Sequence, residues 1–266
     1  MFNFILFKKE MKSLWKMLVI FMAILTLYAG VIITMYDPEK MALLDGYVEA
    51  MPEFMAAVGM TAGATTLLGF MASYLYGFIL LIIPMVFTII CANNLIARYA
   101  DNNSLYALLA APIKRSAVAL TQTLVLLFGI FALMAYVTLL EIGVAQSCFP
   151  GEIDIPQLLL LNFGLLGLHF FIGSICFLCS CLFSDVKNSL TFGAGIPIFA
   201  YILQALANMG GNAEKAKYFT FLTLFNPTGI MEAEVMALAG GGILWVSSFL
   251  LFATAINIFS KKDLNI

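Results

Sequence analysis

Charged residues are scarce in this sequence. Lys, Arg, Asp and Glu make up 11% of its 266 residues, whereas about a quarter is usual in a soluble domain. Hydrophobic residues make up 63%, and one soluble core of this size cannot bury so much apolar surface. The composition therefore excludes a soluble globular domain and indicates that lipid surrounds most of the chain.

Residue types that carry catalysis or bind metals are also rare. The single histidine, His169, lies in an apolar run without charged residues, so we expect it to bond a neighbouring helix or line a cavity. Cys176 and Cys179 form a C-x-x-C in the same run, where small helix-packing residues are expected rather than a metal site. The phosphate-binding pattern G-x-x-x-x-G-K-[ST] is absent. We predict no catalytic residue, no metal ligand and no cofactor in this chain.

Long runs without charge predict an all-α integral membrane protein. Six runs of 20 or more residues contain no Asp, Glu, Lys or Arg, and about 20 apolar residues suffice to span a bilayer as a helix. The longest run begins with a Gly-, Ala- and Thr-rich part, 54–66, which we interpret as an interfacial or re-entrant approach. The predicted single transmembrane domain, 1–266, then has spans at 17–36, 67–92, 116–140, 157–183, 189–209 and 241–260.

The charges between these spans divide unevenly. With both termini on one side, the segments on that side hold ten of the 13 Lys and Arg residues but only four of the 15 Asp and Glu residues. Because basic residues collect in cytoplasmic segments, we expect the N- and C-termini in the cytoplasm. The centres of the spans lack ionisable residues, and Glu141 stands at the outer end of the third. This pattern counts against a proton- or sodium-driven carrier.

The first 16 residues have a helical pattern of their own. At 100° per residue, Phe4, Phe7, Met11 and Leu14 share one face, and the four lysines Lys8, Lys9, Lys12 and Lys16 share the opposite face. The pattern predicts an amphipathic elbow helix over 1–16 that lies on the membrane surface. The alternative is that the lysines only fix the topology of the first span.

The inner loop that follows the second predicted span is expected to contain a short helix over 101–111. Asp101 or Asn102 can cap it, three leucines give it an apolar face, and Pro112 prevents its continuation. Such a helix can dock another protein or cover the membrane boundary, and the residues alone do not decide between the two.

Several motifs, taken in order along the chain, resemble the permease subunits of the ABC-2 family of ABC transporters. In that family a pattern close to acidic-x-x-Gly-Thr/Ser-Leu-x-x-Leu-Leu-x-x-Pro-Ile-x-Arg follows the second helix, and Asn103 here replaces its glycine. The matching residues are Asp101, Ser104, Leu105, Leu108, Leu109, Pro112, Ile113 and Arg115. The elbow pattern, the element Phe225-Asn226-Pro227 and the ending Phe259–Leu264 are similar to further family features.

The resemblance implies an ABC-2 (type V exporter-like) permease in a bacterial cytoplasmic membrane. Its partners would be two ATPase subunits that bind ATP and Mg, a second copy of this chain as a homodimer, and lipid, but no nucleic acid. Loop 101–111 would be the coupling helix. The implied ATPase interface comprises Asp101, Asn102, Ser104, Leu105, Tyr106, Leu108, Leu109, Pro112, Arg115, Asp185 and Lys187.

In the ABC-2 family the second and fifth helices tend to line the path, so the resemblance implies a candidate translocation path made of polar residues on these spans: Ser73, Tyr76, Tyr201, Gln204 and Asn208. Polar faces in membrane helices either line a path or bond helices together. Walls otherwise rich in Phe, Leu and Met suit an amphipathic or hydrophobic cargo, and we expect a peptide exporter. The alternatives are a drug or lipid exporter, and a non-transporting assembly or immunity subunit; an intramembrane enzyme would need a polar catalytic pair that the spans do not offer.

Overall fold

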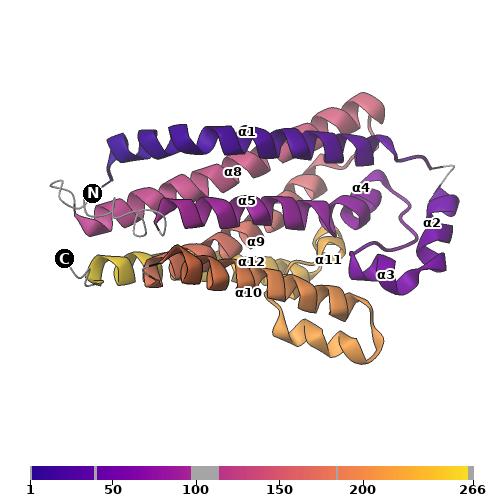
Figure 1. Ribbon diagram of the computed structural model, residues 1–266. Helices are drawn as coiled ribbons and strands as arrows, with labels where there is room; N and C mark the ends of the chain where they lie inside the picture. Colours follow the sequence, from indigo (N-terminus) through magenta and orange to yellow (C-terminus); the bar gives the residue numbers. More distant parts are fainter. Residues whose placement is uncertain (1, 39–40, 97–113, 184, 263–266) are drawn as a thin grey trace.

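Long helices running side by side form the body of the structure (Figure 1). The computed structural model describes residues 2–38, 41–96, 114–183 and 185–262, and within these ranges it contains helices and no strand. Five helices are long and apolar enough to cross a membrane. They are α1 (Phe4–Thr34), α8 (Arg115–Cys148), α9 (Ile155–Leu182), α10 (Val186–Asn208) and α12 (Val235–Lys261).

A bent pair of helices forms a further apolar unit. α4 (Leu67–Met71) continues into the π-helical turn η1 (Ala72–Tyr76), which meets α5 (Ile79–Leu95) at an angle of 43°. If this pair is one span, the described residues hold six spans. The chain is therefore an all-helical, multi-pass membrane protein, as predicted. The remaining elements are α2 (Met41–Ala50), α3 (Pro52–Ala57), η2 (Gly211–Phe219), η3 (Phe221–Leu224) and α11 (Pro227–Met231).

The N-terminal segment differs from the prediction. A separate elbow helix over 1–16 is wrong, because residues 4–34 form one continuous helix, α1. Between Phe4 and Gly30 no proline or glycine interrupts the helix, and Asn3 caps its start by accepting a hydrogen bond from the Leu6 amide at 3.0 Å. At 1.5 Å per residue α1 is about 46 Å long, so it exceeds a hydrocarbon core of about 30 Å.

The predicted second span, 67–92, is not one straight helix. It breaks at Gly77 and Phe78, where the loop after α3 returns against the helix. Gly59 adopts a φ of +79°, and a Cβ added to Gly77 would lie 2.7 Å from the Gly59 carbonyl oxygen. The two glycines thus allow a backbone-to-backbone contact that side chains would prevent. The other spans are close to the predicted ranges but run further, since α8 continues to Cys148 and α12 already begins at Val235.

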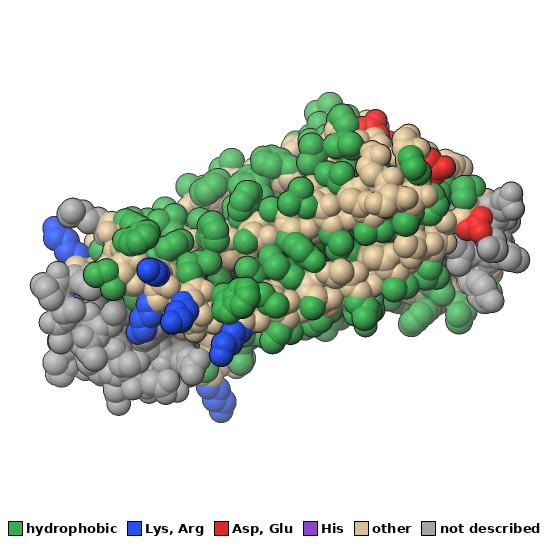
Figure 2. All heavy atoms as spheres, turned by 90° about the horizontal axis from the view of Figure 1, so that it is seen from above, with side chains coloured by type: hydrophobic (Ala, Val, Ile, Leu, Met, Phe, Trp, Pro, Cys, Tyr) green, Lys and Arg blue, Asp and Glu red, His purple; other side chains and the backbone are tan. Residues whose placement is uncertain are grey.

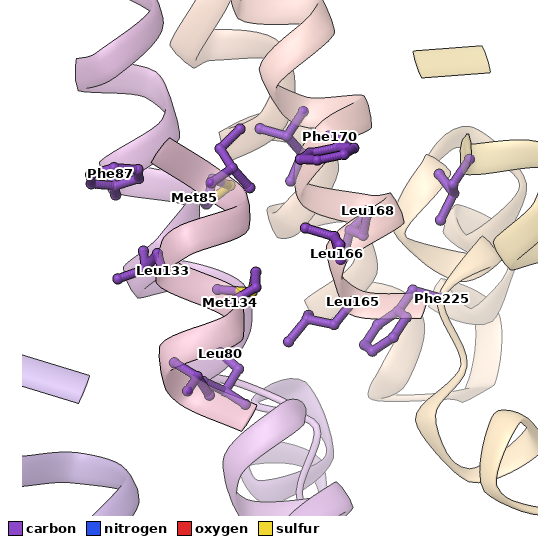
Figure 3. Close-up of a cluster of buried hydrophobic side chains, with 14 of the residues drawn as sticks. Leu80, Met85, Phe87, Leu133, Met134, Leu165, Leu166, Leu168, Phe170 and Phe225 are labelled. Atoms are coloured by element: carbon purple, nitrogen blue, oxygen red, sulfur yellow. The ribbon is translucent and has the colours of Figure 1, made fainter. Parts of the chain in front are cut away.

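Helix α9 forms the centre of the bundle. In its most apolar stretch 78% of the residues are buried, against at most 44% in the other four long helices. It packs against α5, α8, α10 and α12. Figure 3 shows how Leu165 of α9, Leu80 of α5 and Leu133 of α8 fill the interior together, and all three side chains are fully buried. Asp154 caps the start of α9 by accepting a hydrogen bond from the backbone amide of Gln157 at 3.0 Å.

Two side chains of α9 compensate for prolines in the neighbouring helices. Pro84 lies inside α5 and has no N–H for the carbonyl of Leu80, four residues earlier. The Nε2 atom of His169 lies 2.8 Å from that oxygen, and because a carbonyl only accepts, Nε2 carries the hydrogen. The prediction that His169 bonds a neighbouring helix is confirmed.

The same arrangement recurs on the other side of α9. Pro197 inside α10 leaves the carbonyl of Gly193 without its helical donor, and the Cys176 thiol donates to that oxygen at 3.1 Å. In lipid such freed carbonyls have no water to bond, so a neighbouring helix must supply the donor. His169 and Cys176 therefore join α9 to α5 and to α10 through backbone satisfaction as well as packing.

The charges lie at the two ends of the bundle, and both termini lie at the same end (Figure 1). Figure 2 shows Lys and Arg side chains gathered at that end and Asp and Glu side chains at the opposite end, with hydrophobic side chains covering the length between them. We refer to these as the basic end and the acidic end. The uneven division of charge expected from the sequence is thus present in the folded chain.

His169→Leu is expected to lower the free energy of unfolding by about 1–3 kcal/mol, because it leaves the Leu80 carbonyl buried without a donor. Adding Pro84→Ala should recover most of this loss, since residue 84 then supplies the helical N–H. Thermal unfolding of the detergent-purified variants measures both effects.

Pro197→Ala is the matched control for this double variant. It restores an N–H to the Gly193 carbonyl and not to that of Leu80, so it should not rescue His169→Leu. Equal recovery with either proline replacement would contradict the assigned pairing of His169 with the carbonyl freed by Pro84.

Candidate functional site

A cavity of about 380 Å³ opens at the acidic end of the bundle. Residues of α3, η1, α10, η3 and α11 form its wall, together with the loop that carries Gly59 and Thr61. All five residues of the candidate translocation path line it: Ser73, Tyr76, Tyr201, Gln204 and Asn208. The second and fifth spans are more than 100 residues apart in the sequence, and their polar faces meet here.

The far wall of the cavity is held by amide and hydroxyl side chains. Gln204 donates to the Asn208 side chain at 2.9 Å and accepts from the Thr223 hydroxyl at 2.9 Å. Thr223 thereby fixes η3 against α10. Gln204 and Thr223 both face the cavity, so these groups also offer hydrogen bonds to an occupant. Gln204 therefore lines the cavity and also joins α10 to η3 by a hydrogen bond.

Ser73 has a local structural role as well. Its Oγ accepts from the Thr61 amide at 2.7 Å and donates to the Thr61 carbonyl at 3.1 Å. These bonds hold the loop after α3 on η1 and complete the cavity wall. Sequence reasoning found Ser73 but missed Thr61, because the loop lies 12 residues earlier and has no periodic pattern.

A buried polar cluster lies directly behind the cavity wall. Tyr76 donates its hydroxyl hydrogen to Oε2 of Glu141 at 2.9 Å, and the Asn162 amide donates to the same oxygen at 2.7 Å. Glu141 and Tyr76 are fully buried, and Asn162 is 5% exposed. From the sequence, Glu141 was expected only at the end of a span. Asn162 was not predicted, because its one signal is a lone amide in an apolar run.

At the basic end, three of the predicted ATPase-interface residues are described. Arg115 donates to the Lys262 carbonyl at 2.7 Å, Asp185 caps α10 by accepting from the Asn188 amide at 2.8 Å, and Lys187 is exposed. The predicted coupling helix 101–111 lies outside the described residues. So do eight interface residues: Asp101, Asn102, Ser104, Leu105, Tyr106, Leu108, Leu109 and Pro112.

Lys262 joins the ends of two long helices. Its Nζ donates to the carbonyls of Cys181, Leu182 and Phe183 at 3.0–3.1 Å, which are the carbonyls left free at the C-terminus of α9. Partial burial lowers the pKa of Lys262 from its usual value. Lys262 of the C-terminal basic motif thus joins the C-terminus of α12 to that of α9.

No group of three or more His, Cys, Asp or Glu side chains that could hold a metal ion occurs in the described ranges. Comparison of the chain with models of protein families, with curated proteins and with solved structures gave no match. The cavity is lined by hydroxyl, amide, aromatic and aliphatic side chains, and none of the lining residues is charged.

Gly77→Ala is expected to destabilise the protein by about 1–3 kcal/mol. The new Cβ would lie 2.7 Å from the carbonyl oxygen of Gly59 and 2.8 Å from the carbonyl oxygen of Ser73. Gly143→Ala, a helical glycine with nothing within 4 Å of an added Cβ, should instead raise stability by about 0.5–1 kcal/mol. Thermal unfolding distinguishes the two. Equal stability of both variants would show that the loop does not pack on η1 as described.

Proposed function

We propose that this chain is the transmembrane permease subunit of an ATP-driven ABC exporter. The observation that carries the proposal is the cavity at the acidic end, where polar residues from the second and fifth spans meet in an otherwise apolar bundle. A cavity of about 380 Å³ lies within the range of small-molecule sites, and its uncharged polar groups suit an occupant with hydrogen-bonding groups and no net charge at this place.

The energy for transport would come from two separate ATPase subunits. The chain lacks a phosphate-binding loop, and the Asp101–Arg115 segment resembles the coupling segment of ABC-2 permeases. Arg115 bonds the Lys262 carbonyl, and Lys262 bonds the carbonyl of Phe183, which closely precedes Asp185 and Lys187 at the start of α10. Arg115, Asp185 and Lys187 therefore lie together at the basic end. Closure of the ATPase subunits would move the basic end as a rigid body and thereby reshape the cavity at the acidic end. Lipid surrounds the bundle, and a second copy of the chain would complete the path.

The proposed orientation follows the charge distribution. Basic residues favour the cytoplasmic side of a membrane, so the basic end with both termini would face the cytoplasm of a bacterium. The cavity would then lie toward the outside, where an exported cargo leaves. The proposed cargo is an amphipathic or hydrophobic peptide, since tyrosine, phenylalanine and leucine side chains share the cavity wall with amides and hydroxyls.

Replacing Leu105 or Leu109 by Asp is expected to abolish assembly with the partner ATPase and to reduce ATP-dependent transport at least tenfold, because a charge would enter the apolar docking face. Co-purification of this chain with a co-expressed candidate ABC ATPase measures assembly. Val235→Asp is the matched control: it adds the same charge at an exposed position of the acidic end, at the start of α12, and should leave assembly unchanged. Normal complex formation by both leucine variants would remove the docking role.

Cys148 offers a direct test of orientation. It is the one exposed cysteine among the five, all of which are described, and it ends α8 at the acidic end. A membrane-impermeant maleimide should label the wild-type chain in intact cells, and Cys148→Ser should abolish the labelling.

Lys261→Cys in the Cys148→Ser background serves as the control for the opposite end, because Lys261 is exposed in the last turn of α12. It should be labelled in inverted vesicles and protected in intact cells. The reverse pattern would contradict the proposed orientation.

A further inference from the structure

Glu141 is a carboxyl group held inside the bundle with unequal oxygens. Oε2 accepts two hydrogen bonds, from Tyr76 at 2.9 Å and from Asn162 at 2.7 Å. Oε1 is buried and has no partner among the described residues, and the same holds for Oδ1 of Asn162. Two acceptor oxygens in one buried cluster thus lack a hydrogen donor.

Neither α8 nor the helices packed on it place a cation beside Glu141. Arg115, the one cation of α8, stands in its first turn and bonds the Lys262 carbonyl. The elements packed on α8 are α1, α5, α9 and α12. α5 contains no Asp, Glu, Lys, Arg or His, and α1 contains none after Lys16. Among these residue types α9 contains only His169, which already bonds the Leu80 carbonyl. α12 contains only Lys261, which stands in its last turn at the basic end. Tyr76 is the titratable group in contact with the carboxyl.

An ionised carboxylate buried without a countercharge is strongly unfavourable and is normally neutralised. A metal cation is a poor candidate, since such ions take about six oxygen ligands and two open oxygens are present here. A proton satisfies the cluster more simply. It belongs on Oε1, because Oε2 already accepts two hydrogen bonds.

We propose that Glu141 is a proton-binding site that is occupied at neutral pH, and that Tyr76 connects it to the cavity. In the binding step a proton from water joins the Oε1 lone pair, and the carboxylate becomes a neutral acid. Tyr76 stands between the two sites, since it lines the cavity and donates to Oε2. A cavity occupant that draws the Tyr76 hydroxyl away weakens that bond and changes the proton affinity of Glu141. The proton site stands independently of the permease assignment.

Infrared spectroscopy of the full chain in lipid nanodiscs tests this proposal. A protonated carboxylic acid has a carbonyl stretch separate from the bands of carboxylates, and deuterium exchange shifts it. The wild type should show this band at neutral pH, and Glu141→Gln should lose it. Glu53→Gln, which alters an exposed acid of α3, should keep it.

Two further variants separate a proton site from a general change of structure. Tyr76→Phe removes one hydrogen bond to Glu141 and should move the band to higher frequency, whereas Gln204→Leu, on another wall of the cavity, should leave it in place. Absence of the band in the wild type, or its persistence in Glu141→Gln, would overturn the proposal. Loss of the band on addition of sodium would also overturn it, in favour of a cation site. If Glu141→Gln does not fold, the Tyr76→Phe variant decides: a carbonyl band at the wild-type frequency would overturn the proposal.

Discussion

The bundle depends on one constraint, the satisfaction of backbone carbonyls where lipid offers no water. Pro84 and Pro197 each free a carbonyl in the middle of a helix, and α9 supplies the donor to both, through His169 and Cys176. These bonds fix the depth and rotation of α9 relative to α5 and α10. Because η1 precedes α5 directly and α10 carries Tyr201 and Gln204, the same alignment brings the two polar faces together around the cavity.

The charge-free runs predicted the long helices well, because an apolar run in lipid can satisfy its backbone only by forming a helix. The ends were less predictable, since a helix continues past the hydrocarbon boundary where polar residues are acceptable; α8 and α12 both extend in this way. The break at Gly77 could not be read locally, because its cause is the contact with Gly59. The continuity of α1 was missed because an amphipathic pattern does not reveal whether a helix ends.

The resemblance to ABC-2 permeases pointed to the second and fifth spans, and the polar side chains on those spans then gave the candidate path residues. Their meeting in one cavity depends on tertiary packing, as does the burial of Glu141. A carboxyl at the end of a charge-free run suggests the membrane surface, but the bend at Gly77 brings Tyr76 over Glu141, and Asn162 of α9 completes the cluster. Glu141 is the ionisable group of this cluster besides Tyr76. Its burial results from the fold, and the periodicity of the sequence does not show it.

The division of charge, the cavity at the acidic end and the resemblance of the Asp101–Arg115 segment together support a permease driven from its basic end. The most direct measurement is uptake of fluorescent hydrophobic peptides into inverted vesicles that contain this chain and its partner ATPase. ATP should drive accumulation of at least one such peptide, and a non-hydrolysable ATP analogue should not. Absence of ATP-dependent accumulation of every peptide tested, in vesicles where the complex is assembled, would contradict the proposed peptide export.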